Sequence, residues 1–167
     1  MRPTIYTVAY EGPGTVSTMA HPPGGAQLEP YVRGLRRLGV DVLVSAQTDD
    51  ERVECELEEQ AAVVTAAGLQ FVCVPIEDRT APLGSEIVEP VASIYALYRA
   101  GGHVVFHCWA GIGRSSLLAG LLLAMDGVEP DEAWRLISEA RGFPVPDTGE
   151  QEEWLADWWA ARFHVEQ

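Results

Sequence analysis

Apolar residues occur along the chain in two patterns, as short runs and as stripes with helical spacing. Largely apolar runs are typical of strands whose two faces are both covered. They occur at residues 40–46, 69–74 and 103–106. Two more strands are expected at residues 5–10 and 15–20, because a tight Gly-Pro-Gly turn separates them.

Helical spacing of apolar residues predicts helices between and after these strands. They are expected at residues 28–38, 49–67, 84–99, 115–125, 130–141 and 149–163. Helices that alternate with buried strands predict an α/β fold, a central mixed and largely parallel sheet flanked by helices on both faces. Because the sequence contains no internal repeat or linker, residues 1–167 are expected to form one domain.

The charge of the chain argues against several classes of partner. The net charge is −14, so nucleic acid and acidic membrane surfaces would be repelled. Residues 1–5 lack the apolar core of a signal peptide, and the longest strongly apolar stretch, residues 117–125, is too short to span a bilayer. We therefore expect a cytoplasmic protein that binds neither nucleic acid nor membrane.

Missing residue types exclude further chemistry. The sequence contains no lysine and no asparagine, which removes Schiff-base chemistry, the lysine of P-loop kinases and a Cys-His-Asn protease triad. The histidines have neither the paired spacing nor the cysteine neighbours of a zinc site, so we expect no metal and no other cofactor. These histidines are His21, His103, His107 and His164.

One segment, residues 107–116, combines a nucleophile with the elements of a phosphate-binding loop. Its sequence is His-Cys-Trp-Ala-Gly-Ile-Gly-Arg-Ser-Ser, and it lies between a predicted strand and a predicted helix. Backbone N–H groups of such a loop and the N-terminus of the next helix bind anions, and Arg114 can donate two hydrogen bonds to one phosphate. The same positive field favours the reactive thiolate at Cys108. The expected phosphate-binding residues are Trp109, Ala110, Gly111, Ile112, Gly113 and Arg114.

This segment resembles the signature loop of the cysteine-based protein tyrosine phosphatase superfamily, in which His-Cys, five further residues, Arg and then Ser or Thr occur at fixed spacing. All the fixed positions match. The chain is most similar to the dual-specificity branch, in its bacterial type. The resemblance implies the fold of that superfamily, hydrolysis through a phosphocysteine without a metal ion, and phosphorylated proteins or small phosphomonoesters as substrates.

A general acid is expected on the loop that follows the strand at residues 69–74. Hydrolysis of a phosphomonoester needs a group that protonates the leaving oxygen, and Val-Pro-Ile-Glu-Asp resembles the general-acid loop of the dual-specificity branch. Asp78 is the candidate and Glu77 its rival, with a solvated turn carboxylate as the alternative. Arg79 could hold a second anionic group of the substrate, although an ion pair with a surface carboxylate is favoured.

Three further residues are candidates. By resemblance, His107 orients the loop and helps to keep Cys108 ionised; a core histidine with satisfied hydrogen bonds is the alternative. Ser115 is expected to donate to the sulfur when the phosphocysteine is hydrolysed, to cap a helix, or both. Gln151 lies at the end of residues 141–151, where this superfamily returns a loop to the active site. It is a candidate for positioning the hydrolytic water, or an ordinary residue of a helix start.

The other cysteines and the tryptophans are expected to be structural. Cys55 or Cys73 could form a protective disulfide with an oxidised Cys108, but packing thiols are the default for three cysteines at unrelated spacings. The tryptophans of the last helix have the spacing of a buried stripe, which predicts a place in the core.

Phosphomonoester hydrolysis, on a protein substrate of the tyrosine or dual-specificity type, is the predicted function. Two alternatives stay open. A rhodanese-like sulfurtransferase or an arsenate reductase also uses a cysteine in an anion-binding loop, and a non-catalytic phosphate-binding module would need no acid. The spacing of Arg114 and the position of Asp78 favour the phosphatase.

Overall fold

A single five-stranded sheet forms the centre of the molecule in the computed structural model, which describes residues 2–163. The strand order is β1-β2-β5-β3-β4; β1 pairs with β2 antiparallel, and the other neighbouring pairs are parallel. The strands are β1 (Tyr6–Thr7), β2 (Thr15–Met19), β3 (Val42–Ser45), β4 (Gln70–Cys73) and β5 (His103–His107).

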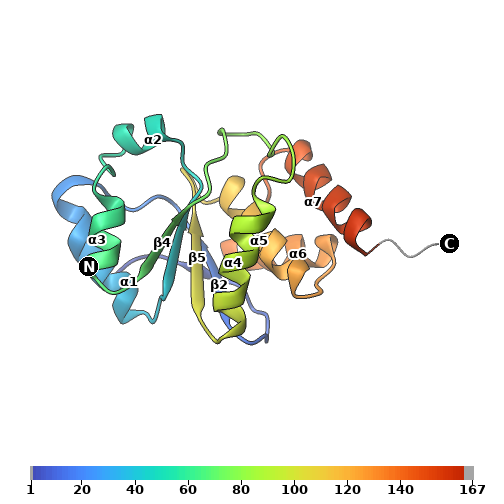
Figure 1. The fold of residues 1–167 in the computed structure, drawn as a ribbon, viewed down its shortest axis with the longest axis horizontal. Helices are drawn as coiled ribbons and strands as arrows, with labels where there is room; N and C mark the ends of the chain where they lie inside the picture. Colours follow the sequence, from blue (N-terminus) through green and yellow to red (C-terminus); the bar gives the residue numbers. More distant parts are fainter. Residues whose placement is uncertain (1, 164–167) are drawn as a thin grey trace.

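Helices cover both faces of the sheet, which confirms the predicted fold class (Figure 1). Helices α1 and α3 pack on one face, and α4, α5 and α6 enclose the larger core on the other. The helices are α1 (Leu28–Arg37), α2 (Asp49–Glu54), α3 (Gln60–Ala66), α4 (Val88–Arg99), α5 (Arg114–Met125), α6 (Pro130–Arg141) and α7 (Gly149–Arg162), with a short 3-10 helix at Gly25–Gln27.

Helix α5 is the hub of the larger core. Its residues 114–124 are all buried, because it packs against α4, α6, α7 and two strands of the sheet. Burial of a leucine side chain contributes about 2 kcal/mol, and five leucines lie on this helix. The start of α5 is therefore a rigid platform for the loop that precedes it.

The carboxyl ends of β2, β3, β4 and β5 meet at one edge of the sheet, since these strands run parallel (Figure 1). β5 leads there into residues 108–113, which we call the signature loop, and β4 leads into residues 77–86, which we call the acid loop. The topology thus brings the two candidate loops together although α4 separates them in sequence.

The predicted helix over residues 49–67 is wrong, because the structure divides it into α2 and α3. Between them Glu56 has a φ of 55°, a left-handed conformation that ends α2. The break places Leu57 in the core beneath α1 and α3, where it is fully buried. Burial of this one apolar side chain offsets the local cost of the turn.

The tryptophans of α7 are half-buried and not the core stripe that their spacing predicts. Leu155 is buried on this helix, whereas Trp154, Trp158 and Trp159 pack against the edge of the core and remain partly exposed. The reason is that α7 contacts the body mainly through α5 and α6, so one side of it faces solvent. In residues 2–163 no helix is long and apolar enough to cross a membrane.

Candidate active site at the carboxyl edge of the sheet

The signature loop is shaped by two glycines that approach neighbouring segments closely. Gly111 has a φ of +76°, and a Cβ on it would lie 2.7 Å from the carbonyl of Met19 at the end of β2. A Cβ on Gly113 would lie 2.9 Å from the Cβ of Asp147. A side chain at residue 111 would collide with backbone, and one at residue 113 with the side chains of Asp147 and Gln151, so glycine fits both positions best.

The signature loop lines a pocket of about 280 Å³. Within the described chain, the backbone N–H groups of residues 109–113 form no hydrogen bonds. Free N–H groups in a loop that opens a helix are a site for an anion. The pocket is lined by Asp78, Arg79, Cys108, Trp109, Ala110, Ile112, Gly113, Arg114 and Asp147.

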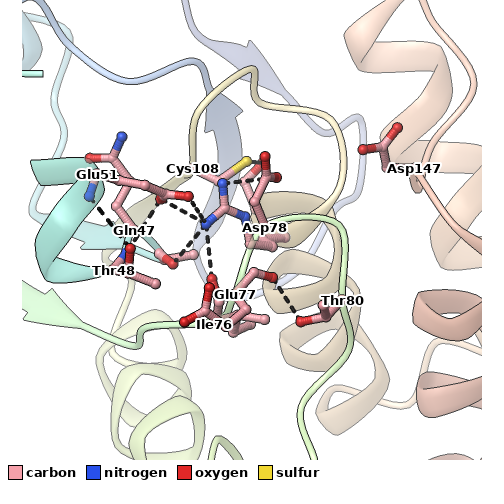
Figure 2. Close-up of polar contacts among 12 residues, drawn as sticks. Gln47, Thr48, Glu51, Ile76, Glu77, Asp78, Thr80, Cys108 and Asp147 are labelled. Carbon is pink, nitrogen blue, oxygen red and sulfur yellow. Dashed lines mark hydrogen bonds and ion pairs between the residues drawn. The ribbon is translucent and has the colours of Figure 1, made fainter. Parts of the chain in front are cut away.

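The guanidinium of Arg114 is held by hydrogen bonds at Nη1, whereas Nε and Nη2 form none within residues 2–163. Its side chain is 1% exposed, and Nη1 donates to both carboxylate oxygens of Glu51, at 3.0 and 2.8 Å, and to the carbonyl of Ile76 at 2.9 Å (Figure 2). Nε and Nη2 form no hydrogen bond with the described residues, although Nη2 lies 3.1 Å from a carboxylate oxygen of Asp78. These two adjacent donors have the geometry that suits two oxygens of one phosphate.

Asp78 rather than Glu77 faces this pocket. An oxygen of Asp78 forms an ion pair with Nη2 of Arg114 at 3.1 Å, beside Cys108 (Figure 2). Glu77 lines a different pocket, with Pro82 and Leu83. The two residues begin a turn that is closed by the bond from the Thr80 N–H to the Glu77 carbonyl at 3.2 Å, and their side chains line different pockets.

Cys108 is 3% exposed, with Sγ at the base of the pocket. The sulfur is 3.3 Å from Oγ of Ser115, the second residue of α5, within hydrogen-bond distance. Ser115 does not cap this helix; the N-cap residue is Gly113.

His107 is fully buried behind the signature loop and is neutral. Its Nδ1 lies 3.1 Å from the carbonyl oxygen of Cys108, and because a carbonyl only accepts, Nδ1 carries the proton. Nε2 then accepts from the side-chain amide of Gln60 at 2.9 Å. Burial lowers the pKa of His107 to about 4, against the opposing effect of the Cys108 carbonyl. The neutral imidazole therefore binds the backbone of Cys108 without adding charge.

This low pKa predicts a pH-dependent stability. An unfolded chain binds a proton at this histidine below about pH 6.5, whereas the folded chain does so only below about 4. Stability should thus fall as pH decreases between these values, by up to about 3 kcal/mol from this residue. Urea unfolding at pH 7 and pH 4.5 should show a smaller fall for His107→Gln than for the wild type. Equal falls would contradict the assignment.

Of the two less specific candidates, Arg79 lines the pocket and Gln151 lies behind it. Arg79 lines the pocket with a φ of 62° and forms no ion pair with residues 2–163, so the favoured surface ion pair is absent there. Gln151 is fully buried against Gly113 but does not line the pocket. Its Oε1 accepts from the N–H groups of Asp147 and Thr148, which is the capping box that starts α7.

Sequence reasoning missed Glu51 and Asp147. The spacing of Thr48 and Glu51 signals the capping box that starts α2, but nothing in the sequence connects Glu51 with Arg114. Asp147 belongs to the returning segment in which only Gln151 was considered, and its carboxylate lines the pocket opposite the acid loop (Figure 2).

The other thiols have partners away from Cys108. Cys55 accepts from the side chain of Gln47 and Cys73 from that of Arg52, both at 3.5 Å. Burial raises the pKa of both thiols. Among residues 2–163, no group of His, Cys, Asp and Glu side chains is arranged to hold a metal ion. His164 lies outside the described residues.

The sequence is similar to known phosphatases. Residues 17–127, well over half of the chain, match a family model described as "Polymorphic toxin system, DSP-PTPase phosphatase". Human protein tyrosine phosphatase type IVA 3 is 25% identical over 142 residues, which cover 84% of this chain and 76% of that protein. Human dual specificity protein phosphatase 1 is 32% identical over 80 residues, which cover 47% of this chain and 22% of that protein.

Solved structures share the fold. Kinase associated phosphatase, with its catalytic-site cysteine replaced by serine, superposes with a TM-score of 0.85 at 18% identity, and covers 100% of this chain and 99% of its own. The active form of Tk-PTP superposes with a TM-score of 0.72 at 24% identity, with 95% and 98% covered. At these identities the likeness concerns the arrangement of strands and helices.

Proposed function

Since the chain belongs to the DSP-PTPase phosphatase family and is thus a cysteine-dependent phosphatase, we propose that Cys108 forms its phosphocysteine intermediate. The observation that carries this proposal is that Cys108 shares its pocket with the Nε and Nη2 donors of buried Arg114, which form no hydrogen bond with the described residues, although Asp78 lies 3.1 Å from Nη2. A sulfur nucleophile beside a two-donor anion site is what phosphoryl transfer to sulfur requires.

The substrate phosphate occupies the space between the signature loop and Arg114. Two of its oxygens accept from Nε and Nη2, and the free N–H groups of residues 109–113 bind the others. The phosphate takes the place of the Asp78 carboxylate, which lies 3.1 Å from Nη2 in the structure, and Asp78 then faces the leaving oxygen. Hydrogen bonds that involve a charged group contribute about 1.5–3 kcal/mol each, so the loop binds phosphate without lysine or metal.

In the first step the thiolate of Cys108 attacks phosphorus from the base of the pocket. The P–S bond forms as the bond from phosphorus to the leaving oxygen breaks, and Asp78 donates its proton to that oxygen. Arg114 and the loop N–H groups stabilise the three equatorial oxygens, where negative charge is spread. Glu51 keeps the guanidinium in place during this step, since it binds the edge that phosphate does not need.

In the second step water attacks the phosphocysteine. Asp78, now ionised, takes a proton from the water, the P–S bond breaks, and inorganic phosphate is released. The Ser115 hydroxyl, 3.3 Å from the sulfur, donates to the departing thiolate and makes it a better leaving group. Asp147 places a second carboxylate in the same pocket.

The sulfurtransferase and the non-catalytic module are the weaker proposals. Neither chemistry uses a proton donor beside the sulfur, yet Asp78 lies in the pocket with Cys108. The net charge and the three unpaired thiols also favour a cytoplasmic protein whose substrates are phosphorylated proteins or small phosphomonoesters rather than nucleic acids.

Purified protein should release phosphate from 4-nitrophenyl phosphate in excess EDTA at the same rate as without it. The reason is that the positive field comes from Arg114 and backbone N–H groups. A parallel assay with thiosulfate and cyanide should yield no thiocyanate. Thiocyanate without phosphate release would favour the sulfurtransferase, and loss of phosphate release on chelation, restored by a divalent ion, would refute the metal-free mechanism.

A further inference from the structure

Helix α7 reaches the acid loop with two side chains. Nε2 of Gln151 donates to the carbonyl of Thr80 at 3.1 Å, and the indole Nε1 of Trp154 donates to the carbonyl of Gly84 at 3.0 Å. The two donors are three residues apart, so they lie on the same side of the helix. They bind the acid loop at two points, on either side of its exposed tip at Leu83.

The acid loop has little else to hold it. Its own bonds are local, such as those of Thr80 to the carbonyl of Glu77 and of the Leu83 N–H to Glu86. Within the described chain, the acid loop has only two other polar contacts with the rest of the fold besides these α7 side chains. They are the bond from the Val88 N–H at the start of α4 to the Ser85 carbonyl at 3.0 Å and the ion pair of Asp78 with Arg114 at 3.1 Å. A loop with few buried contacts samples open conformations readily unless such bonds restrain it.

Gln151 also ties the acid loop to the signature loop. The side chain is fully buried, its Oε1 is fixed by two backbone N–H groups, and its amide packs against Gly113. Asp78 is two residues from Thr80, the residue that Gln151 binds. Together with the ion pair of Asp78 with Arg114, α7 therefore restrains this short stretch and the distance from Asp78 to the pocket.

We propose that α7 acts as a clamp that holds the acid loop closed over the signature loop, with Trp154 as a positioning residue for general-acid catalysis by Asp78. The proposal rests on the proposed function, because it assigns Trp154 a role only through Asp78. Trp154 does not line the pocket and does not contact the substrate phosphate.

The test is Trp154→Phe, which keeps an aromatic ring but removes the N–H donor to Gly84. Loss of one hydrogen bond should lower the population of the closed loop on the order of 5-fold to 10-fold. kcat/KM for phenyl phosphate, whose leaving group needs a proton, should fall by that factor. kcat/KM for 4-nitrophenyl phosphate, whose leaving group is stable as an anion, should stay near the wild-type value.

Trp158→Phe is the matched control. Trp158 is also half-buried on α7, but its indole forms no hydrogen bond with residues 2–163. This variant should retain both activities. Equal losses on the two substrates in Trp154→Phe would indicate general damage and overturn the clamp, and unchanged activity on both would overturn it as well.

Asp78→Ala, measured beside Trp154→Phe, separates failure of the clamp from failure of the proposed function. If Asp78→Ala shows the leaving-group dependence and Trp154→Phe does not, only the clamp is wrong. If neither variant shows it, both the acid assignment and the clamp are wrong. The double variant should be no slower on phenyl phosphate than Asp78→Ala alone, because the clamp acts through the carboxylate that is already absent.

Discussion

Cys108→Ser is expected to lower turnover on the order of 10⁴-fold or more, as removal of an essential nucleophile does in other covalent enzymes. A serine hydroxyl is a far weaker nucleophile than a thiolate. Phosphate binding should survive, because Arg114 and the free N–H groups of residues 109–113 are unchanged. Steady-state kinetics and isothermal titration with inorganic phosphate would measure the two effects separately.

Cys73→Ser is the control for this experiment. Cys73 is exposed at the end of β4 and binds the side chain of Arg52, away from the pocket. Its replacement should leave both turnover and phosphate binding near the wild-type values. Turnover near wild type in Cys108→Ser would exclude a covalent mechanism at this residue.

Asp78→Ala should slow the enzyme in proportion to the leaving group's need for a proton. With phenyl phosphate we expect a loss on the order of 10²–10⁴ in kcat. With 4-nitrophenyl phosphate the loss should be small at low pH. The comparison isolates proton donation, because a displaced loop would lower both rates alike.

Glu77→Ala is the matched control, since the two carboxylates are adjacent in sequence but line different pockets. It should behave like the wild type on both substrates. The leaving-group dependence in Glu77→Ala, and not in Asp78→Ala, would show that the wrong carboxylate has been assigned.

Most of the sheet could be predicted because buried strands appear in the sequence as short apolar runs. The runs at residues 40–46 and 103–106 contain β3 and β5, which are paired on both sides and largely buried. The run at 69–74 contains β4, which lies at the edge of the sheet and is only partly buried. The break between α2 and α3 could not be predicted in this way. It depends on the burial of Leu57 beneath α1 and α3, which is a property of the assembled fold.

The signature loop could be recognised because its characteristic residues all lie within ten consecutive positions, 107–116. The contacts that complete the site come from distant segments. In the sequence Glu51 indicates only a capping box with Thr48, and the fold places its carboxylate 2.8 Å from Arg114. This ion pair has a physical reason, since a buried guanidinium without a fixed anion would be costly. Glu51 does not contact Nε or Nη2, the donors that we propose bind the substrate.

The contacts of α7 with the acid loop could not be predicted for the same reason. The spacing of its tryptophans is that of a buried stripe, yet the helix lies at the rim of the molecule, and Trp154 binds the acid loop across 70 residues of sequence. Periodicity reports that a side chain is partly buried, but it does not report which segment covers it.

The most direct test of the account is to trap the phosphocysteine. Wild-type protein mixed with 4-nitrophenyl phosphate and quenched with acid within one turnover should carry one phosphate on the peptide that contains Cys108, detected by mass spectrometry, and Cys108→Ser should carry none. If the wild-type protein releases phosphate but carries no label on Cys108, or carries the label on another residue, the account is contradicted.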